Sequence, residues 1–145
     1  MPEFKQLLKQ IEMFMGLSDE ELIKVGQVCQ EVSIPSGQTI IERNEPADCF
    51  YLIEEGTVEI LTAGEQDPSV VVTLGNGQIF GEMALVDSGK RSASVRAATD
   101  AVVLKVDCNA FIDLCETDTQ LGYRIMRNVA SDLSFKLRHR NLIQI

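Results

Sequence analysis

The residues best suited to chemistry lie in one segment, 77–95, which reads GQIFGEMALVDSGKRSASV. A glycine-rich turn leads into a few helix-compatible residues, and a second turn precedes a predicted strand that begins with Arg91. The unpaired N–H groups at the start of a helix suit an anion, and Gly81 allows close approach of the backbone. Arg91 adds a planar guanidinium for two phosphate oxygens, and Ser92 adds a hydroxyl. The segment predicts a site for one negative charge.

Glu82 places a carboxylate beside this predicted site, where it repels an anion unless it accepts a hydrogen bond from the same ligand. A ribose hydroxyl meets that need. A singly charged phosphodiester with a sugar hydroxyl therefore fits better than a triphosphate, which requires a P-loop lysine and magnesium. No G-x-x-x-x-G-K-[ST] motif occurs in the chain. The simpler alternative is a structural ion pair between Arg91 and Glu82.

The composition restricts the class of protein that can carry this segment. A chain of 145 residues with 45% hydrophobic and 24% charged residues is typical of one soluble globular domain. Its net charge of -9 would repel a phosphate backbone and an anionic membrane surface, so we expect no nucleic-acid partner. Residues 121–145 hold five basic residues against one acidic residue, and we interpret them as a solvated helix face.

The cysteines and the histidine exclude further classes. The four cysteines form no C-x-x-C pair and are predicted to be buried free thiols. A single histidine, His139, cannot supply a multi-histidine metal site. This also excludes most hydrolase mechanisms. We therefore expect that the chain binds no metal and no cofactor and that it is not an enzyme. The sequence shows no leader peptide and no membrane-spanning run, which predicts a cytoplasmic location without membrane insertion.

Helical spacing dominates both ends of the chain. Apolar residues from Phe4 to Met15 predict one helix, and a capping box at 18–21 opens a second helix that extends through Val32. Asp107 is a predicted N-cap of a later helix. The final helix places an apolar residue at every fourth position, at Leu121, Ile125, Val129, Leu133 and Leu137. This stripe suits packing on the rest of the chain and dimerisation equally well.

Short β-branched and aromatic runs, separated by turn signals, fill the middle of the chain. We expect antiparallel strands at 39–41, 50–53, 58–61, 70–74, 92–97 and 102–106. The predicted fold is mainly β, an antiparallel β-roll or jelly-roll sandwich with N-terminal helices and a C-terminal helical segment. We expect a single domain over 1–145, with helices in 1–33, the β-roll in 34–106 and helices again in 107–145.

At segment 77–95 the sequence resembles the cyclic nucleotide-binding domain family, the module of cAMP-dependent kinase regulatory subunits, cyclic-nucleotide-gated channels and catabolite-activator-type regulators. The family's phosphate-binding cassette is similar to F-G-E-[LM]-A-L, five further residues and R-[STA]-A-[TS]-V, and this chain matches every element at that spacing. The resemblance extends to GLSDEEL at 16–22 and YLIEEGTV at 51–58. It departs mildly at Asn44, where a turn glycine is common, and at Lys90, where proline is frequent.

The resemblance implies a ligand and a role for each cassette residue. Glu82 takes the ribose 2′-hydroxyl, Arg91 takes the cyclic phosphate, and backbone groups of Gly81, Ala84 and Leu85 complete the cassette with Ser92. Ile60 and Val71 are matched by strand position alone, and the resemblance implies that they form the floor of the pocket for the base and ribose. Lys136 and Leu137 fall near the position from which the terminal helix contacts the base. The ligand implied is cAMP or cGMP, and we favour cAMP because Ser92 is not the threonine often associated with cGMP.

The function predicted is a regulatory cyclic-nucleotide sensor that signals through movement of its C-terminal helix to its own dimer or to a downstream protein. Three alternatives are weighed against it. A catabolite-activator-type transcription regulator carries a helix-turn-helix after the long helix, and this chain ends at Ile145. A degenerate family member would act as an interaction scaffold. A cupin-type enzyme needs a cluster of histidine and carboxylate metal ligands.

Overall fold

The computed structural model describes residues 4–61, 69–86 and 89–139, and the side chains of Val71 and Lys136 lie outside that description. The chain divides into two compact units. The β unit comprises Val28–Phe111, and the helical unit comprises the described parts of 1–27 and 112–145.

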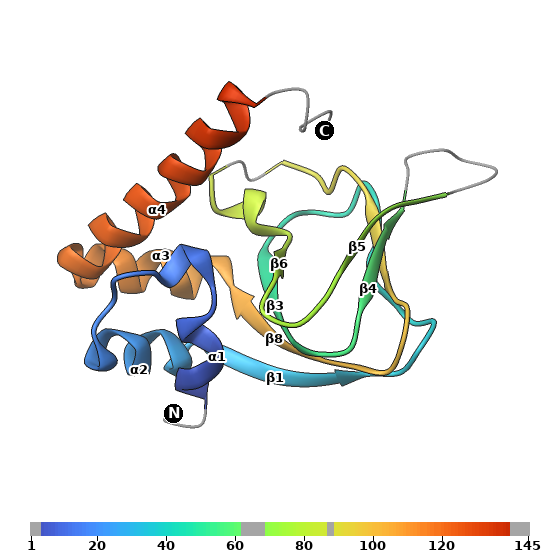
Figure 1. Ribbon diagram of the computed structural model, residues 1–145, viewed down its shortest axis with the longest axis horizontal. Coiled ribbons are helices and arrows are strands. Elements are labelled where there is room, and N and C mark those ends of the chain that lie inside the picture. The colour runs from blue at the N-terminus through green and yellow to red at the C-terminus, as the bar shows by residue number, and fades with distance from the viewer. Residues whose placement is uncertain (1–3, 62–68, 87–88, 140–145) are drawn as a thin grey trace. The chain divides into compact units, whose positions relative to one another are not determined.

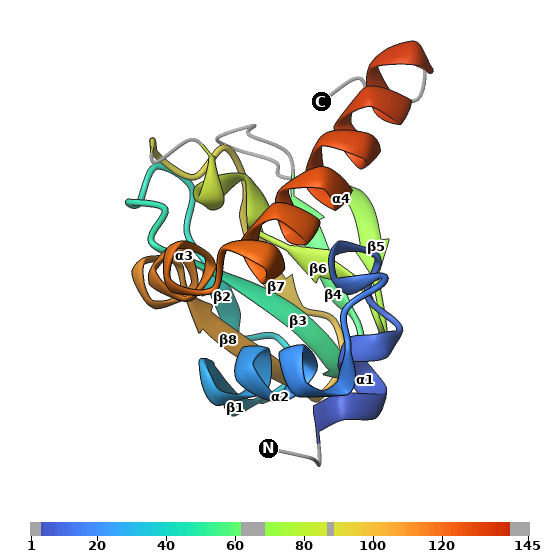
Figure 2. The ribbon, with the colours of Figure 1, turned by 90° about the vertical axis from the view of Figure 1, so that its left-hand side faces the viewer.

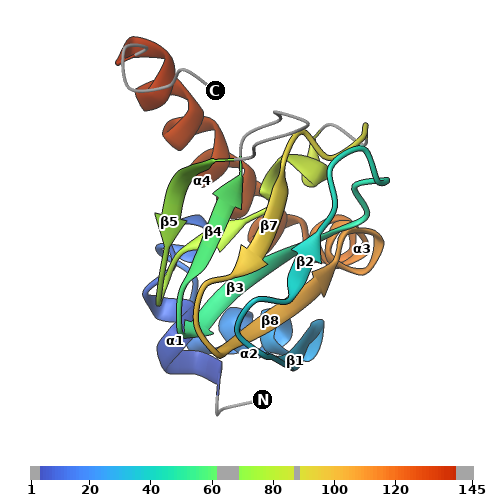
Figure 3. The same cartoon turned by 90° about the vertical axis from the view of Figure 1, so that its right-hand side faces the viewer.

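The β unit contains eight described strands in two antiparallel sheets (Figures 1 and 3). The strands are β1 (Cys29–Ile34), β2 (Thr39–Ile41), β3 (Cys49–Glu55), β4 (Val58–Leu61), β5 (Val70–Leu74), β6 (Ile79–Phe80), β7 (Ser94–Ala97) and β8 (Ala101–Asp107). One sheet has the order β1-β8-β3-β6 and the other the order β2-β7-β4-β5. The predicted antiparallel, mainly β class with flanking helices is confirmed.

The core of the β unit is formed by apolar side chains from both sheets. Ile53 and Val103 of the first sheet and Val58 of the second have no exposed surface. Tyr51 stacks on Phe80, with ring centroids 4.9 Å apart and an interplanar angle of 11°. Burial of each such aliphatic side chain contributes roughly 1.5–3 kcal/mol, so the two sheets form a firm support for the loops between strands.

The six predicted strands all form, but two strands were missed and some limits differ. β1 takes residues assigned to the second helix: Val32 pairs with Val103 of β8 instead of continuing a helix. The β-roll therefore begins at Cys29 and not at residue 34. The strand expected from residue 92 begins at Ser94, because Arg91 pairs by its backbone with the turn at residues 44–45. Backbone pairing with residues distant in the sequence sets where these strands begin. The local spacing of apolar residues does not predict that pairing.

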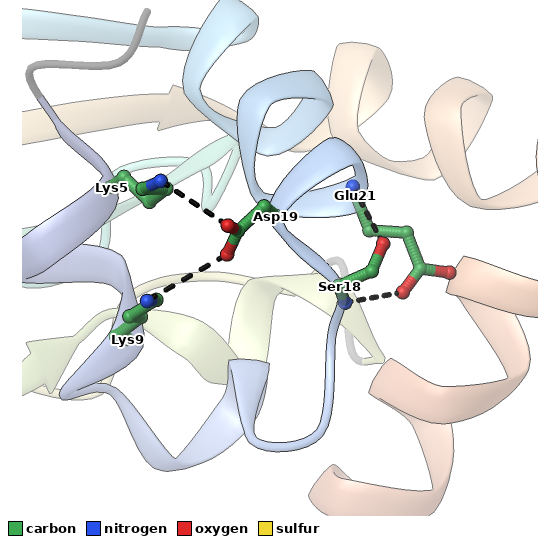
Figure 4. A network of polar contacts seen from close by, with 5 residues as sticks. All are labelled: Lys5, Lys9, Ser18, Asp19 and Glu21. Carbon is green, nitrogen blue, oxygen red and sulfur yellow. Dashed lines mark hydrogen bonds and ion pairs between the residues drawn. The ribbon is translucent and has the colours of Figure 1, made fainter.

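The helical unit contains α1 (Lys5–Lys9), the 3-10 turn η2 (Glu12–Phe14), α2 (Asp19–Gln27), the second half of α3 (Cys108–Thr117) and α4 (Thr119–Arg138) (Figure 2). The predicted capping box forms at the start of α2 (Figure 4). The Ser18 N–H donates to Glu21 Oε1 at 2.8 Å, and the Glu21 N–H donates to Ser18 Oγ at 3.1 Å. Asp19 Oδ2 and Oδ1 lie 3.3 Å from Lys5 Nζ and 3.7 Å from Lys9 Nζ, respectively.

The single helix predicted from Phe4 to Met15 is wrong. α1 ends at Lys9, and Ile11 has an extended backbone with ψ of 125°. The carbonyl groups of Met13 and Met15 instead accept hydrogen bonds from the Asn128 side chain of α4, at 2.8 and 2.9 Å. These long-range bonds satisfy carbonyls that a continued helix would otherwise pair.

The apolar stripe of α4 divides along its length. Leu121 and Ile125 are fully buried and Val129 is half-buried, whereas Leu133 and Leu137 are 46% and 64% exposed. The predicted N-cap of α3 is confirmed, because the Ala110 N–H donates to Asp107 Oδ2 at 2.9 Å. In the described ranges, no helix has the length and apolar character needed to span a membrane.

Candidate functional site

The predicted cassette folds around Gly81, at the end of β6. Gly81 adopts a left-handed backbone with φ of 80°, which glycine tolerates without a steric cost. A four-residue 3-10 helix, η3 (Glu82–Leu85), follows it. The Ala84 N–H, expected to face a ligand, donates to the Gly81 carbonyl at 3.2 Å and is therefore used within the turn.

Arg91 is held beside this turn by its backbone. Its N–H donates to the Glu45 carbonyl at 2.8 Å, and its own carbonyl accepts from the Asn44 N–H at 3.0 Å. Asn44 has φ of 77°, the left-handed conformation expected of an asparagine that replaces a turn glycine. The loop between β2 and β3 thus fixes the start of the Arg91 side chain.

The Arg91 side chain is only 9% exposed, and it is the one buried charged side chain among the described residues. Its Nη2 donates to the Cys49 carbonyl at 2.7 Å and contacts Cys49 Sγ at 3.4 Å. Its Nη1 lies 3.4 Å from the Gly81 carbonyl. All of these acceptors are uncharged.

The ion pairs identified among the described residues join Asp19 to Lys5 and Lys9, Lys24 to Asp118, and Arg96 to Glu59; none of these includes Arg91. The Arg91–Glu82 ion pair weighed above is not one of them. A guanidinium carries five N–H donors, and fewer than five have acceptors among the described residues. The remaining donors can bind an anion without displacing a protein carboxylate.

The other predicted cassette residues surround Gly81 and Arg91 in sequence but differ in burial. Ala84 is buried, Glu82 and Leu85 are half-buried, and Ser92 is exposed. Ser94, which follows the cassette arginine by three residues, is not a free surface hydroxyl, because its Oγ accepts from the Arg43 N–H at 3.0 Å.

The structure describes only part of the predicted base and ribose pocket. Ile60 is partly buried and packs against the core of the β unit, opposite Val72 of β5. Val71 lies in β5, but its side chain is outside the described residues, as is that of Lys136. Leu137 is exposed on α4 in the helical unit. The pocket thus stays a prediction.

Sequence reasoning missed two residues at the site, Cys49 and Tyr51. The cysteines were assigned to structure, and Cys49 is indeed a buried free thiol. Alternation along β3 places Cys49, Tyr51 and Ile53 in the same core, which the strand pattern indicates. The contact of Cys49 with Arg91 joins residues 42 positions apart, and no local pattern predicts it.

The other three cysteines are free thiols as predicted, but only Cys108 is buried, whereas Cys29 and Cys115 are partly exposed. Burial raises the pKa of Cys29 to about 12 and that of Cys108 to about 11, so both stay protonated at neutral pH. Among the described residues, no group of three or more histidine, cysteine or acidic side chains is arranged to hold a metal ion.

Comparison with known proteins identifies the family. Residues 31–118 match the family model described as the cyclic nucleotide-binding domain. The chain is 33% identical over 108 residues to a cAMP-dependent protein kinase regulatory subunit from Emericella nidulans, covering 74% of this chain and 26% of that protein. It is 31% identical over 125 residues to a cyclic nucleotide-gated potassium channel from Mesorhizobium japonicum, covering 86% and 33%.

The catabolite activator protein of Thermus thermophilus has a similar fold, with a TM-score of 0.78 and 28% identity over 90% of this chain and 60% of that one. The chain spans about a quarter to a third of the length of the two curated relatives above. The resemblance drawn from segment 77–95 is confirmed, and so is the β-roll fold. The chain belongs to the cyclic nucleotide-binding domain family, whose role is regulatory rather than catalytic.

Proposed function

We propose that this chain is a sensor that binds one 3′,5′-cyclic nucleotide per β unit, with cAMP as the preferred ligand and Arg91 as the residue that binds its phosphate. The observation that supports this most directly is the buried guanidinium with uncharged acceptors. A buried cation without an opposite charge is costly, and a singly charged phosphodiester would compensate it.

The roles of the neighbouring residues follow the family motif. Glu82 accepts from the ribose 2′-hydroxyl, and Gly81, Ala84, Leu85 and Ser92 form the wall around the phosphate. Ile60 and Val71 contact the base and ribose from β4 and β5. The preference for cAMP is supported by the similarity to a regulatory subunit whose name specifies cAMP and by serine at residue 92.

Calorimetric titration with cAMP and with cGMP tests the proposal. Arg91→Ala should weaken cAMP binding by roughly a hundredfold or more, because charge-assisted hydrogen bonds of about 1.5–3 kcal/mol each are lost. Arg96→Ala is the matched control: it removes the same charge from β7, where the Arg96 side chain is 45% exposed and is paired with Glu59 at 2.9 Å. Equal affinity in Arg91→Ala and the parent protein would show that the ligand site lies elsewhere.

The role of Glu82 has a separate test. Glu82→Gln should cost about 1–3 kcal/mol of binding free energy, since an amide oxygen still accepts from the ribose. Glu55→Gln, an exposed change on β3, is its control. Removing the ligand's 2′-hydroxyl should weaken binding to the parent protein, and normal binding of the 2′-deoxy ligand would contradict this role.

The proposed output is a change in the C-terminal helix. A contact of the base with Lys136 or Leu137 in one arrangement of the helix, and not in another, would let the ligand shift the balance between them. Hydrogen exchange with and without cAMP should show protection gained in 121–139 as well as in 80–92. Protection restricted to 80–92 would leave a passive binding module or scaffold.

The exposed apolar face of α4 supports a second copy of the chain as one partner of the sensor. Tyr123, Met126, Ala130, Leu133 and Leu137 recur at steps of three and four residues, and all are exposed. This heptad spacing is the pattern that two helices bury against each other. We further propose a cytoplasmic location and a downstream protein partner, as for a regulatory subunit.

A further inference from the structure

Cys49 contacts the proposed phosphate-binding arginine through two of its atoms. Arg91 Nη2 lies 2.7 Å from the Cys49 carbonyl oxygen and 3.4 Å from Cys49 Sγ. The cysteine is 5% exposed, so water does not compete freely for either contact. The Gly81 carbonyl contacts Nη1 at 3.4 Å, and the Cys49 carbonyl alone would hold Nη2 through one hydrogen bond. The sulfur provides a second point of contact on Nη2.

The direction of each hydrogen bond follows from the donor inventory. A guanidinium has only donors, so the sulfur of Cys49 must accept from Arg91. The thiol hydrogen is then available to Tyr51, whose Oη lies 3.4 Å from Cys49 Sγ. Arg91, Cys49 and Tyr51 thus form a directed chain of donors.

Tyr51 is a rigid end point for this chain. It is 8% exposed, its ring stacks on Phe80 with centroids 4.9 Å apart, and its Cα is paired with that of Phe80 between β3 and β6. Burial raises the pKa of the Tyr51 hydroxyl well above its usual range, so the group stays neutral. The two sheet strands therefore fix the hydroxyl, the hydroxyl fixes the thiol, and the thiol fixes the arginine.

We propose that the Cys49 side chain, oriented by Tyr51, is a positioning group that holds the Arg91 guanidinium ready for the ligand phosphate. This inference rests on the proposed function. It makes a buried thiol a determinant of cyclic-nucleotide affinity, because a guanidinium held before binding loses less freedom when the ligand arrives.

The experiment measures cAMP affinity by calorimetry in single and double variants. Cys49→Val removes the thiol at similar volume and should weaken binding roughly tenfold, about the value of one hydrogen bond to a charged group. Cys49→Ser keeps an acceptor and a donor and should stay within about threefold of the parent protein. Cys108→Val is the control for loss of a buried thiol, since Cys108 is also 5% exposed and interacts with Arg91 electrostatically, whereas Cys49 contacts Arg91 through a hydrogen bond.

A double-mutant cycle separates positioning of Arg91 from a general effect on the core. In an Arg91→Lys background, which keeps the charge but loses the planar fork, Cys49→Val should change affinity by less than about twofold. The same tenfold loss in both backgrounds would overturn the inference. If Cys49→Val unfolds, Tyr51→Phe provides the test, because it removes only the hydroxyl and should weaken binding in the Arg91 background alone.

Failure of this inference is distinguishable from failure of the proposed function. If Cys49→Val and Tyr51→Phe bind like the parent protein while Arg91→Ala does not bind, the positioning role is wrong and the ligand site stands. If Arg91→Ala binds like the parent protein, the site itself is wrong.

Discussion

Gly81 brings the cassette backbone close to the Arg91 side chain. Its φ of 80° disfavours any residue with a Cβ, and a Cβ built there would lie 3.0 Å from Arg91 Nη1. The absence of a side chain at this position thus permits the left-handed turn and leaves room for the Arg91 guanidinium.

Gly81→Ala should therefore lower the free energy of unfolding by about 1–2 kcal/mol and also weaken cAMP binding. Gly37→Ala separates the two effects, because Gly37 has φ of 89° but no atom within 4 Å of its added Cβ. Urea denaturation should show a loss of stability for both variants, and calorimetry should show a loss of affinity for Gly81→Ala alone. A loss of affinity in Gly37→Ala would assign the effect to backbone strain in general.

At the scale of single elements, α4 depends on the carboxylate of Asp118. Asp118 Oδ1 accepts from the Leu121 N–H at 3.2 Å, and Oδ2 accepts from Lys24 Nζ at 2.7 Å. The Lys24 hydrogen bond, followed by that from the Leu121 backbone, lowers the pKa of Asp118. One side chain therefore caps α4 and ties it to α2.

This arrangement predicts the response of the helical unit to acid. Because the pKa of Asp118 is lower in the folded state, its contribution to stability is present above the unfolded pKa of about 4 and is lost as pH falls through the lower, folded pKa. Circular dichroism should show less helix loss with falling pH in Asp118→Asn, which is less stable at neutral pH, than in the parent protein. Asp113→Asn, an exposed change on α3, should follow the parent curve.

The elements also show what a sequence can predict. The capping box of α2 and the cap of α3 depend on residues three apart, so their spacing predicted them. The cassette was predicted because its residues lie close together in the chain. β1, the break after Lys9 and the contact of Cys49 with Arg91 depend on partners dozens of residues away. The spacing of residues over a few positions cannot predict contacts with those partners.

At the scale of the whole molecule, the exposed heptad face of α4 predicts self-association. Analytical ultracentrifugation should show a dimer for the parent chain and a monomer for Leu133→Asp, because the change places a carboxylate in the apolar face. Ser134→Asp is the control, since Ser134 is exposed and lies outside the heptad positions. A parent protein that is monomeric at micromolar concentrations would contradict the dimer.

The hydrogen-bond acceptors described for Arg91 are uncharged, which sets the stability of the ligand-free fold against the capacity to bind the ligand. Without ligand, the protein carries a desolvated cation that an apolar side chain of similar length would not impose. Arg91→Met should therefore melt at the same temperature as the ligand-free parent or above it, whereas saturating cAMP should raise the melting temperature of the parent alone. A ligand-free Arg91→Met protein that melts far below the parent would mean that the guanidinium is mainly a structural brace. The expected result would mean that selection for a stable fold, in a lineage that had stopped sensing the nucleotide, would remove this arginine early.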